Sequence, residues 1–456
     1  MKKVTIGEIV SAVKGDLLQG DPNRPVERVS TDTRSLLPGD IFFALVGANH
    51  DGHQYALQAV DKGAAALVLA KAIPGIDSRV PVIKVSDTLL ALQALAAYNR
   101  RQFDIPVIAV TGSNGKTTTK DLIYSVLSQK YRVLKTRGNF NNEIGLPLTL
   151  LELNEEHDMA VLEMGMRGLG QIDELCKIAG INAGIITNIG ETHLEVLGSI
   201  ENIAQAKGEI LQNVPPEGFG LIPAESQEAL KQAGRCRGKV LTFGLDCVGD
   251  YVAVDVQTGR CGSSFVAVTP VGELLIKLPL PGRHNVSNAM AALAVGLKMG
   301  LSLNEVATGL AKAEISDMRL QVIHTGKFTI INDAYNANPQ STKAALTALA
   351  DLAGERRQVA VLGNMYELGQ REQQGHYEVG LAAKNVDMLV TVGQLAKYTA
   401  QGGRLSGIKP GNVYWFADNG SATDFLKKAL KPHDVILVKG SRGMGMEEIV
   451  ESIKDM

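Results

Sequence analysis

The segment VIAVTGSNGKTTTKDL, Val107 to Leu122, decides the fold of the middle of this chain. A short apolar run typical of a buried strand leads into a glycine-rich turn, and a helical spacing of apolar residues follows. A turn of this kind between a strand and a helix presents backbone N–H groups and the positive end of the helix dipole to phosphate. The segment therefore predicts a loop that holds the phosphates of a nucleotide.

The loop is a short form of the common phosphate-binding pattern. A glycine normally stands five residues before the Gly-Lys pair, but that position is Val110 here, and the first glycine is Gly112. Lys116 is placed to meet the β- and γ-phosphates, and Thr117 to ligate Mg²⁺. The nucleotide-binding residues predicted from this segment are Thr111, Gly112, Ser113, Asn114, Gly115, Lys116, Thr117 and Thr118.

The composition indicates a globular protein of several domains. The chain has 456 residues, 45% of them apolar and 21% charged, with a formal net charge of −2. A net charge this close to zero gives no overall positive potential that would attract nucleic acid. The apolar runs are also shorter than the ~20 residues that a membrane-spanning helix needs. No apolar core of signal-peptide length follows Met1, so we expect a cytoplasmic protein. The cysteines form no CxxC pair or His/Cys cluster and are expected to be free thiols: Cys176, Cys236, Cys247 and Cys261.

Three blocks of different pattern predict an α/β protein with domains at 1–103, 104–315 and 316–456. Between about 241 and 280 in the second block, apolar and polar residues alternate with a period of two. This alternation predicts an antiparallel insertion with turns at 258–259 and 271–272. Helices are predicted over 89–98 and 288–297. Strands are predicted at 41–46, 65–69, 82–85, 107–110, 159–162, 184–186, 328–332, 359–362, 388–392, 413–416 and 435–438.

Three titratable residues in the second block lie near the ends of predicted strands or on a predicted helix, and the position of Glu163 suggests a metal site. Glu163 ends an apolar strand, at the edge where ligands collect in an open α/β sheet, and a carboxylate suits Mg²⁺. His193 follows another apolar strand, and Lys207 lies fourteen residues later on a predicted helix. Taken alone, Glu163 also fits a solvated strand end, His193 fits a structural histidine, and Lys207 fits a surface lysine on a helix.

The loop sequence TGSNGKTTT resembles that of the Mur ligase family, the ATP-dependent amide-bond formers of peptidoglycan precursor synthesis. The resemblance covers essentially the whole chain. It implies an N-terminal α/β domain for a UDP-linked substrate, a central P-loop ATPase domain with a parallel sheet, and a C-terminal Rossmann-like domain. It also implies an ADP-forming ligase in which a substrate carboxylate becomes an acyl phosphate and an amine then displaces phosphate.

The same resemblance implies roles for individual residues. His193 matches a second-metal position, and Lys207 matches a lysine that the family carries as a carbamate, so the implied metal-binding set is Thr117, Glu163, His193 and Lys207. Arg319 matches an arginine that reaches the phosphates. The implied catalytic set is Lys116, Glu163, His193, Lys207 and Arg319. Asn288 is expected on the adenine side, Asp333 at the ribose and Tyr335 beside the base.

Other motifs narrow the expected substrates. The sequence DAYNANPQS at 333–341 and the tail LVKGSRGMGME at 437–447 resemble members that add D-alanyl-D-alanine to UDP-N-acetylmuramoyl-tripeptide. An amide-rich loop is expected to read the substrate through directional hydrogen bonds. The expected substrate-binding residues are Thr136, Asn139, Asn141 and Asn142 in that loop, and Ser30, Asp32, Thr33 and Arg34 in the UDP-binding segment. The alternative within the family is the tripeptide-forming ligase, which adds a diamino acid.

Some features separate these expectations from other classes of protein. A GTP-dependent switch needs a guanine-reading NKxD element, which the sequence lacks, and a scaffold without turnover would have lost Lys116, Glu163 or His193. One position departs from the family pattern, because Asn364 stands where an aspartate is expected. We therefore expect a monomeric enzyme that uses ATP and Mg²⁺ in cell-wall synthesis, and with it in cell shape and division.

Overall fold

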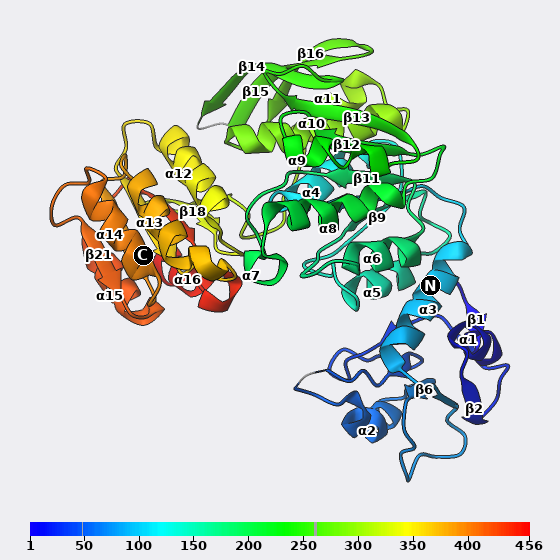
Figure 1. Cartoon of the computed structure of the whole chain (residues 1–456). Helices are drawn as coiled ribbons and strands as arrows, with labels where there is room; N and C mark the ends of the chain where they lie inside the picture. Colours follow the sequence, from blue (N-terminus) through cyan, green and yellow to red (C-terminus); the bar gives the residue numbers. More distant parts are fainter. Residues whose placement is uncertain (48, 260–261) are drawn as a thin grey trace.

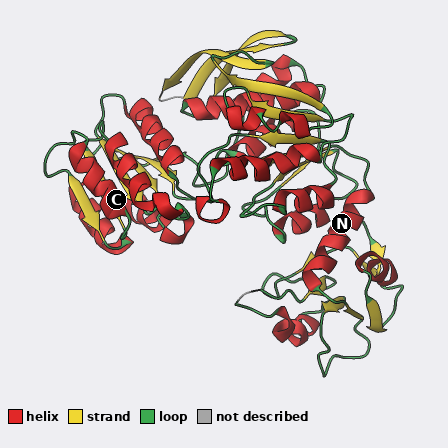
Figure 2. Ribbon diagram, viewed as in Figure 1, coloured by secondary structure: helices red, strands yellow, loops and turns green. Residues whose placement is uncertain are grey.

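The computed structural model describes residues 1–47, 49–259 and 262–456, and within these the strands form three main sheets in chain order. Figure 1 shows the corresponding parts of the chain: the blue N-terminal part, the cyan and green central part, and the yellow to red C-terminal part. Helices cover the sheets in each part (Figure 2). The predicted three-part α/β architecture is confirmed. In the described part of the chain, no helix has both the length and the apolar character needed to cross a membrane.

The N-terminal part is built on a five-stranded sheet in the order β2-β7-β6-β5-β4, beside a small β1-β3 pair. The predicted apolar runs at 41–46, 65–69 and 82–85 contain its inner strands, in which every residue except Lys84 is buried. The elements are β1 (Val4–Thr5), α1 (Ile6–Val13), β2 (Asp16–Gln19), β3 (Pro25–Val26), β4 (Val29–Ser30), β5 (Ile41–Phe43), η1 (Gly52–Tyr55), α2 (Ala56–Asp61), β6 (Ala66–Leu69), β7 (Val82–Lys84) and α3 (Thr88–Arg101).

The central part is a nine-stranded sheet in the order β16-β15-β14-β13-β12-β11-β8-β10-β9. Its strands are β8 (Val107–Thr111), β9 (Val133–Lys135), β10 (Met159–Glu163), β11 (Ala183–Ile186), β12 (Phe219–Pro223), β13 (Lys239–Leu245), β14 (Tyr251–Gly259), β15 (Gly262–Thr269) and β16 (Gly272–Leu278). Its helices are α4 (Lys116–Leu127), α5 (Gly145–Leu151), α6 (Gln171–Ala179), α7 (Leu194–Leu197), α8 (Ile200–Gln212), α9 (Gln227–Leu230), η2 (Ala233–Arg235), α10 (Arg283–Lys298) and α11 (Leu303–Ala311).

The predicted antiparallel strands of the central part are confirmed, because β14 pairs antiparallel with β15 and β15 pairs antiparallel with β16. They join the main sheet through β14, which pairs in parallel with β13. The expected turn at Thr258 and Gly259 is wrong, since both residues belong to β14 and pair with Ser263 and Gly262. Cys261, expected as a free thiol, lies outside the described residues. Periodicity showed the strand type but not which strand would be the neighbour.

The C-terminal part is a six-stranded sheet in the order β17-β18-β22-β19-β20-β21. The five predicted strands are present and parallel, and an unpredicted edge strand, β17, runs antiparallel to β18. The elements are β17 (Gln321–His324), β18 (Thr329–Asp333), α12 (Pro339–Ala353), β19 (Gln358–Gly363), η3 (Gly369–Arg371), α13 (Glu372–Ala382), β20 (Met388–Val392), α14 (Ala396–Leu405), β21 (Val413–Phe416), α15 (Asn419–Ala429), β22 (Val435–Lys439), η4 (Arg442–Met444) and α16 (Glu447–Lys454).

The hydrophobic cores divide the molecule unequally. One cluster of buried side chains runs from Val4 in the N-terminal part to Ala229 in the central part, so these two parts share a core. The buried clusters of the C-terminal part contain only residues from Leu320 to Ile453. The C-terminal part is therefore a separately packed body that meets the rest through other kinds of contact.

Candidate active site

A cleft of ≈ 1060 Å³ lies where the central sheet faces the C-terminal part. Its walls come from the phosphate loop, the ends of β10 and β11, helices α8 and α10, and the segments around β18 and α12. The residues predicted from sequence that line it are Ser113, Asn114, Gly115, Lys116, Thr117, Thr118, Asn139, Asn141, Asn142, Glu163, His193, Lys207, Asn288, Arg319, Asp333 and Tyr335. Residues up to 222 positions apart in sequence, Ser113 and Tyr335, are thus collected around one space.

The phosphate loop has a backbone that only glycine adopts easily. Gly112 and Gly115 have φ angles of 152° and 77°. A Cβ at Gly112 would collide with the Thr187 hydroxyl, and one at Gly115 would stand 2.7 Å from Asn288 Oδ1. Helix α10 therefore packs so closely against the phosphate loop that it restricts the conformation of the loop. Asn288, on this helix, lies directly behind the loop.

The segment after β11 holds the loop from its other side. Ser113 N donates to Asn188 O at 3.0 Å, and Asn114 N donates to Asn188 Oδ1 at 2.9 Å. Ser113 Oγ donates to Gly190 O at 2.9 Å. Sequence reasoning did not identify these supporting residues. Their position immediately after an apolar strand of the same sheet was the available signal.

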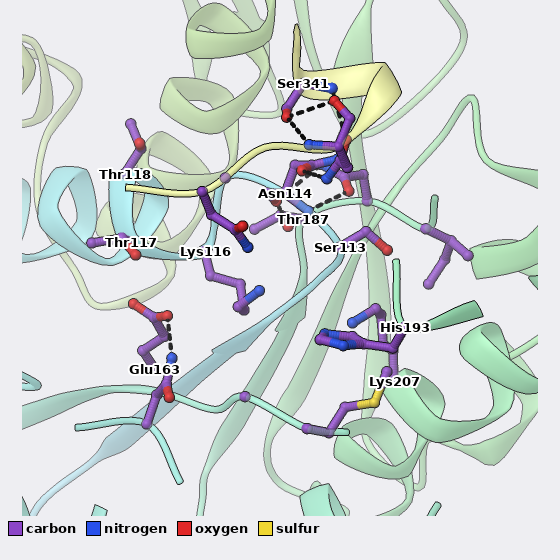
Figure 3. A pocket seen from close by; sticks show the side chains of 18 of the residues that line it. Ser113, Asn114, Lys116, Thr117, Thr118, Glu163, Thr187, His193, Lys207 and Ser341 are labelled. Atoms are coloured by element: carbon purple, nitrogen blue, oxygen red, sulfur yellow. Dashed lines mark hydrogen bonds between the residues drawn. The ribbon is translucent and has the colours of Figure 1, made fainter. Parts of the chain in front are cut away.

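Lys116 is the first residue of helix α4, and its side chain points into the cleft (Figure 3). Its Nζ donates to Gly112 O at 2.8 Å, which curls the lysine over the loop. Burial lowers the pKa of Lys116, the Glu163 carboxylate opposes that effect, and Arg319 adds to it. A cation and a helix N-terminus at one point favour the binding of a phosphate group.

Glu163 ends β10 and is 2% exposed. Asn141 Nδ2 donates to its Oε1 at 2.7 Å, while Oε2 is buried without a hydrogen-bond partner among the described residues. A buried carboxylate oxygen is costly unless something compensates its charge. The arrangement fits a cation close to Thr117, the hydroxyl residue of the phosphate loop that also lines the cleft.

No group of three or more His, Cys, Asp or Glu residues suited to a metal ion occurs in the part of the chain that the structure describes. This agrees with the preference of Mg²⁺, which takes one or two protein carboxylates and completes its octahedron with water and substrate phosphates. The residues present fit Mg²⁺ better than a metal that needs a full cage of protein ligands.

His193 and Lys207 lie on the opposite side of the same cavity (Figure 3). His193 is held with a positive φ of 57°, and its Nδ1 lies 2.7 Å from Glu367 Oε2 in the C-terminal part. The pKa of Glu367 is lowered, mainly by this hydrogen bond. A carboxylate on one ring nitrogen orients the other nitrogen, as in many metal-binding histidines.

Lys207 is 2% exposed on helix α8, and no hydrogen bond or salt bridge joins its Nζ to another described residue. Burial, and then the charge of Lys116, hold the pKa of Lys207 well below its ordinary value. This buried environment disfavours the charged form of the Lys207 amine, which distinguishes it from a surface lysine.

Arg319 and Tyr335 meet where the C-terminal part faces the cleft. The Arg319 guanidinium carbon stacks 3.8 Å from the centre of the Tyr335 ring. Met318 and Leu320, on either side of Arg319, both have positive φ angles, which are strained for residues with side chains. This segment therefore presents Arg319 in a defined direction.

Asp333 does not pair with Arg319. Its Oδ2 accepts a hydrogen bond from Lys439 Nζ at 2.6 Å, and its Oδ1 accepts one from Leu320 N at 3.1 Å. Sequence reasoning did not identify Lys439 as its partner, because β22 follows more than a hundred residues later and becomes a neighbour only in the folded sheet.

Some predicted residues lie away from the cleft walls. Three of them lie just behind the residues that line the cleft: Thr111, Gly112 and Thr136. Thr136 Oγ1 accepts a hydrogen bond from Glu163 N at 3.0 Å. The UDP-binding candidates do not line the cleft: Ser30, Asp32, Thr33 and Arg34. They form a local turn of the N-terminal part, in which the Asp32 and Arg34 side chains pair at 2.7 Å.

Asn364 has a local structural role. Its Oδ1 accepts hydrogen bonds from Leu395 N and Ala396 N at 3.0 and 2.9 Å, where helix α14 begins. An amide oxygen satisfies these donors without adding a buried charge. The departure from the family pattern is therefore compatible with the fold.

Comparisons with known proteins place every part of the chain. Family models match in three stretches: the Mur ligase family catalytic domain at 25–100, the Mur ligase middle domain at 110–296 and the Mur ligase glutamate ligase domain at 318–442. The chain is 41% identical to UDP-N-acetylmuramoyl-tripeptide--D-alanyl-D-alanine ligase of Bacillus subtilis, with 99% of each chain covered. It is 36% identical to the Escherichia coli protein of that name, with 100% of this chain and 99% of that protein covered.

Solved structures agree with these relatives. MurF from Acinetobacter baumannii superposes with a TM-score of 0.91 at 33% identity, with 100% of both chains covered. MurF from Thermotoga maritima in complex with ADP superposes with a TM-score of 0.83 at 28% identity, with 94% of this chain and 97% of that chain covered.

Proposed function

This chain belongs to the Mur ligase family, and we propose that it joins D-alanyl-D-alanine to UDP-N-acetylmuramoyl-tripeptide while converting ATP to ADP and phosphate. The end-to-end similarity to relatives with this name supports the substrates. The single observation that carries the chemistry is the convergence of Lys116, Glu163 and Arg319 on one cleft. Two cations and a carboxylate with a free oxygen suit the transfer of a phosphoryl group.

The reaction divides into two steps. A carboxylate oxygen of the tripeptide attacks the γ-phosphorus, the bond to the β–γ bridging oxygen breaks, and ADP leaves. The amine of the dipeptide then attacks the acyl carbon, the acyl C–O bond breaks, and phosphate departs as the new amide nitrogen loses a proton. Lys116 and the N-terminus of helix α4 stabilise the charge on the phosphate oxygens, and Arg319 approaches them from the C-terminal part.

The proposed metal site uses Glu163 and Thr117, with His193 and Lys207 toward a second position. Mg²⁺ bound there supplies positive charge to the transferring phosphoryl group. Glu163 contributes the oxygen that has no partner, and Asn141 holds the other oxygen in place. Asn141 thereby links the amide-rich loop to the carboxylate, so that substrate contacts in this loop can influence the geometry of the site.

We propose that Lys207 is carried as a carbamate. A neutral amine attacks CO₂, forms an N–C bond and loses a proton, which replaces a cation by an anion with two oxygens. The lowered pKa of Lys207 favours the neutral amine, and the buried position beside Lys116 favours an anion over a second cation.

The carbamate is tested with Lys207→Ala, for which we expect near-complete loss of ligation and partial recovery with formate. Lys177→Ala, which removes an exposed lysine of helix α6, is the matched control and should have full activity in both conditions. A crystal structure grown with bicarbonate should show the modified side chain. Full activity of Lys207→Ala without added carboxylate would contradict the proposal.

The remaining assignments follow the three parts of the chain. We propose domains at 1–103 for the UDP-linked substrate, 104–315 for ATP, and 316–456 for closing the site. The proposed UDP contacts are Ser30, Asp32, Thr33 and Arg34, and the proposed peptide contacts are Thr136, Asn139, Asn141 and Asn142. Asn288 and Tyr335 are assigned to the adenine side and Asp333 to the ribose. We further propose that the enzyme acts as a monomer in the cytoplasm.

The function is tested with a matrix of acceptors and donors, scoring the new amide product by mass. We expect product only when ATP, a UDP-N-acetylmuramoyl-tripeptide and D-alanyl-D-alanine are all present. Acceptors with lysine and with diaminopimelate at the third peptide position belong in the matrix. Product formed from UDP-N-acetylmuramoyl-dipeptide and a free diamino acid would instead support the tripeptide-forming ligase.

A further inference from the structure

A buried ion cluster beneath the cleft contains groups that the proposed reaction does not use. Asp121 on helix α4 is 0% exposed and Lys120 is 1% exposed. Lys120 Nζ lies 3.1 Å from Asp121 Oδ1, and Lys135 Nζ donates to the same oxygen at 3.0 Å. A carboxylate so deeply buried must have its other oxygen satisfied as well.

The second oxygen of Asp121 is used by the segment that leads into the C-terminal part. Ser316 N and Ser316 Oγ donate to Asp121 Oδ2 at 3.0 and 2.7 Å. Burial alone would raise the pKa of Asp121, but Lys120 and the other partners outweigh it and hold the pKa below the ordinary value. The carboxylate therefore stays charged, and hydrogen bonds to a charged acceptor are the strong ones.

The position of Ser316 limits the position of Arg319. Three residues of extended chain span at most about 11 Å, so a fixed Ser316 keeps Arg319 within that reach. Lys116 and Asp121 lie on the same helix, five residues apart, which corresponds to about 7.5 Å along its axis. Helix α4 thus carries Lys116 itself, and through the contact of Asp121 with Ser316 it also holds the segment that contains Arg319.

Asp121 cannot easily shift, because its partner Lys120 also bonds to the segment that supports Glu163. Lys120 Nζ also donates to Thr136 O at 2.8 Å, and Thr136 Oγ1 accepts the hydrogen bond from Glu163 N. The same cluster therefore contacts the helix of the phosphate loop, the strand-end segment that supports Glu163, and the segment entering the C-terminal part.

From this geometry we propose that Asp121 is a positioning residue: it clamps Ser316 to helix α4 and so sets where Arg319 stands relative to Lys116 when the cleft closes on a nucleotide. Asp121 is fully buried and does not line the cleft, so it acts through Ser316. The proposal rests on the nucleotide site proposed above, and it concerns the segment through which the C-terminal part is attached.

The first test is Ser316→Ala, which removes one hydrogen bond to Asp121 from a partly exposed position. We expect kcat to fall by about three- to tenfold, with the Kd for ADP, measured by calorimetry, close to that of the wild type. The matched control is Ser302→Ala. Ser302 N and Oγ both donate to Glu305 Oε2 at 2.7 Å in a helix cap outside the cleft. Ser302→Ala should lower stability without lowering kcat.

The second test is the double substitution Asp121→Leu with Lys120→Met, which replaces the buried pair by apolar side chains. Only Lys135 loses a charged partner, and its side chain is 30% exposed and can turn toward water. We expect a folded protein that binds ADP, has a kcat at least tenfold lower, and compacts less in solution scattering with nucleotide and UDP-tripeptide.

The outcomes separate this inference from the proposed function. If the wild-type protein makes no product under any condition, the proposed ligase function is contradicted. An active wild type with an unchanged kcat in Ser316→Ala and in the folded double variant overturns the clamp. If the double variant does not fold, Ser316→Ala decides: a lowered kcat with unchanged ADP binding supports the clamp, and an unchanged kcat overturns it.

Discussion

The central part of the molecule is joined to its two neighbours by different chemistry. At the N-terminal junction, the buried guanidinium of Arg100 donates to the carbonyls of Phe103, Ile105, Ala179 and Gly180. A continuous apolar core surrounds these bonds. Opening this junction would expose both apolar surface and unsatisfied carbonyl groups, so the first two parts form one rigid unit.

At the C-terminal junction the contacts are polar and reach across the cleft. Asn338 Nδ2 donates to Asn114 Oδ1 at 2.6 Å, and Arg371 pairs with Glu191. The buried clusters of the C-terminal part stop at Leu320. Water and ligands can replace such contacts at little cost, so this junction can open and close. The comparison teaches that the candidate active site lies at the junction that can move, whereas the rigid junction only holds the N-terminal part in place.

The largest expected effect is on the phosphate contact in the mobile junction. Lys116→Ala should lower ligation by about 10³-fold, because a charge-assisted contact to the transferring phosphoryl group is lost. Product formation by mass is the measurement. Binding of the UDP-substrate should stay near that of the wild type, since its proposed contacts lie in the N-terminal part and in the loop at 136–142, outside the phosphate loop.

Lys130→Ala is the matched control for this prediction. Lys130 follows the same helix but donates to Gly300 O outside the cleft. Wild-type turnover in Lys116→Ala would show that the loop is not part of the active site. It would also contradict the proposal that the reaction takes place at the mobile junction.

The next largest effect is on the stability of the rigid junction. Arg100→Leu should lower the free energy of unfolding by about 3 kcal/mol or more, because buried carbonyls lose their donors. The denaturant midpoint of the first two parts is the measurement. Arg101→Leu changes the adjacent exposed arginine and should be nearly neutral. Equal effects of the two substitutions would mean that the junction is not held by buried hydrogen bonds.

A smaller effect is expected at the polar junction. Arg371→Met removes contacts to Glu191 and Glu378 and should change the free energy of unfolding by less than about 1 kcal/mol, since these groups are partly exposed. The same substitution should shift the unliganded protein toward more open shapes in solution scattering.

Arg132→Met removes an exposed pair with Asp158 inside the central part and serves as the control. It should change neither stability nor shape appreciably. A large loss of stability in Arg371→Met would show that the C-terminal junction is as rigid as the N-terminal one.

The smallest expected effect is a change of overall dimension in the wild type. An ATP analogue together with UDP-tripeptide should reduce the radius of gyration, because nucleotide contacts from Lys116 and Arg319 require both sides of the cleft. High salt should increase the radius of the unliganded protein through screening of the polar junction. An unchanged radius at saturating ligand would contradict a closing motion.

The sequence by itself determined the local features of this protein. The strand, glycine turn and helix around Lys116 were predicted because turn geometry and helix spacing depend on neighbouring residues. Glu163 at the end of an apolar strand was predicted for the same reason. The resemblance carried by these motifs then indicated the family, and the comparisons confirmed it.

Only the tertiary structure decided what lies beside these features. Strand order placed β14 in the main sheet, and chain folding brought Asn338 to Asn114, Lys439 to Asp333 and Ser316 to Asp121. Such partners are separated by more than a hundred residues, and their pairing depends on how whole sheets and helices pack. A periodic pattern states which face of an element is buried, but the neighbour that covers it is chosen by the packing of the complete chain.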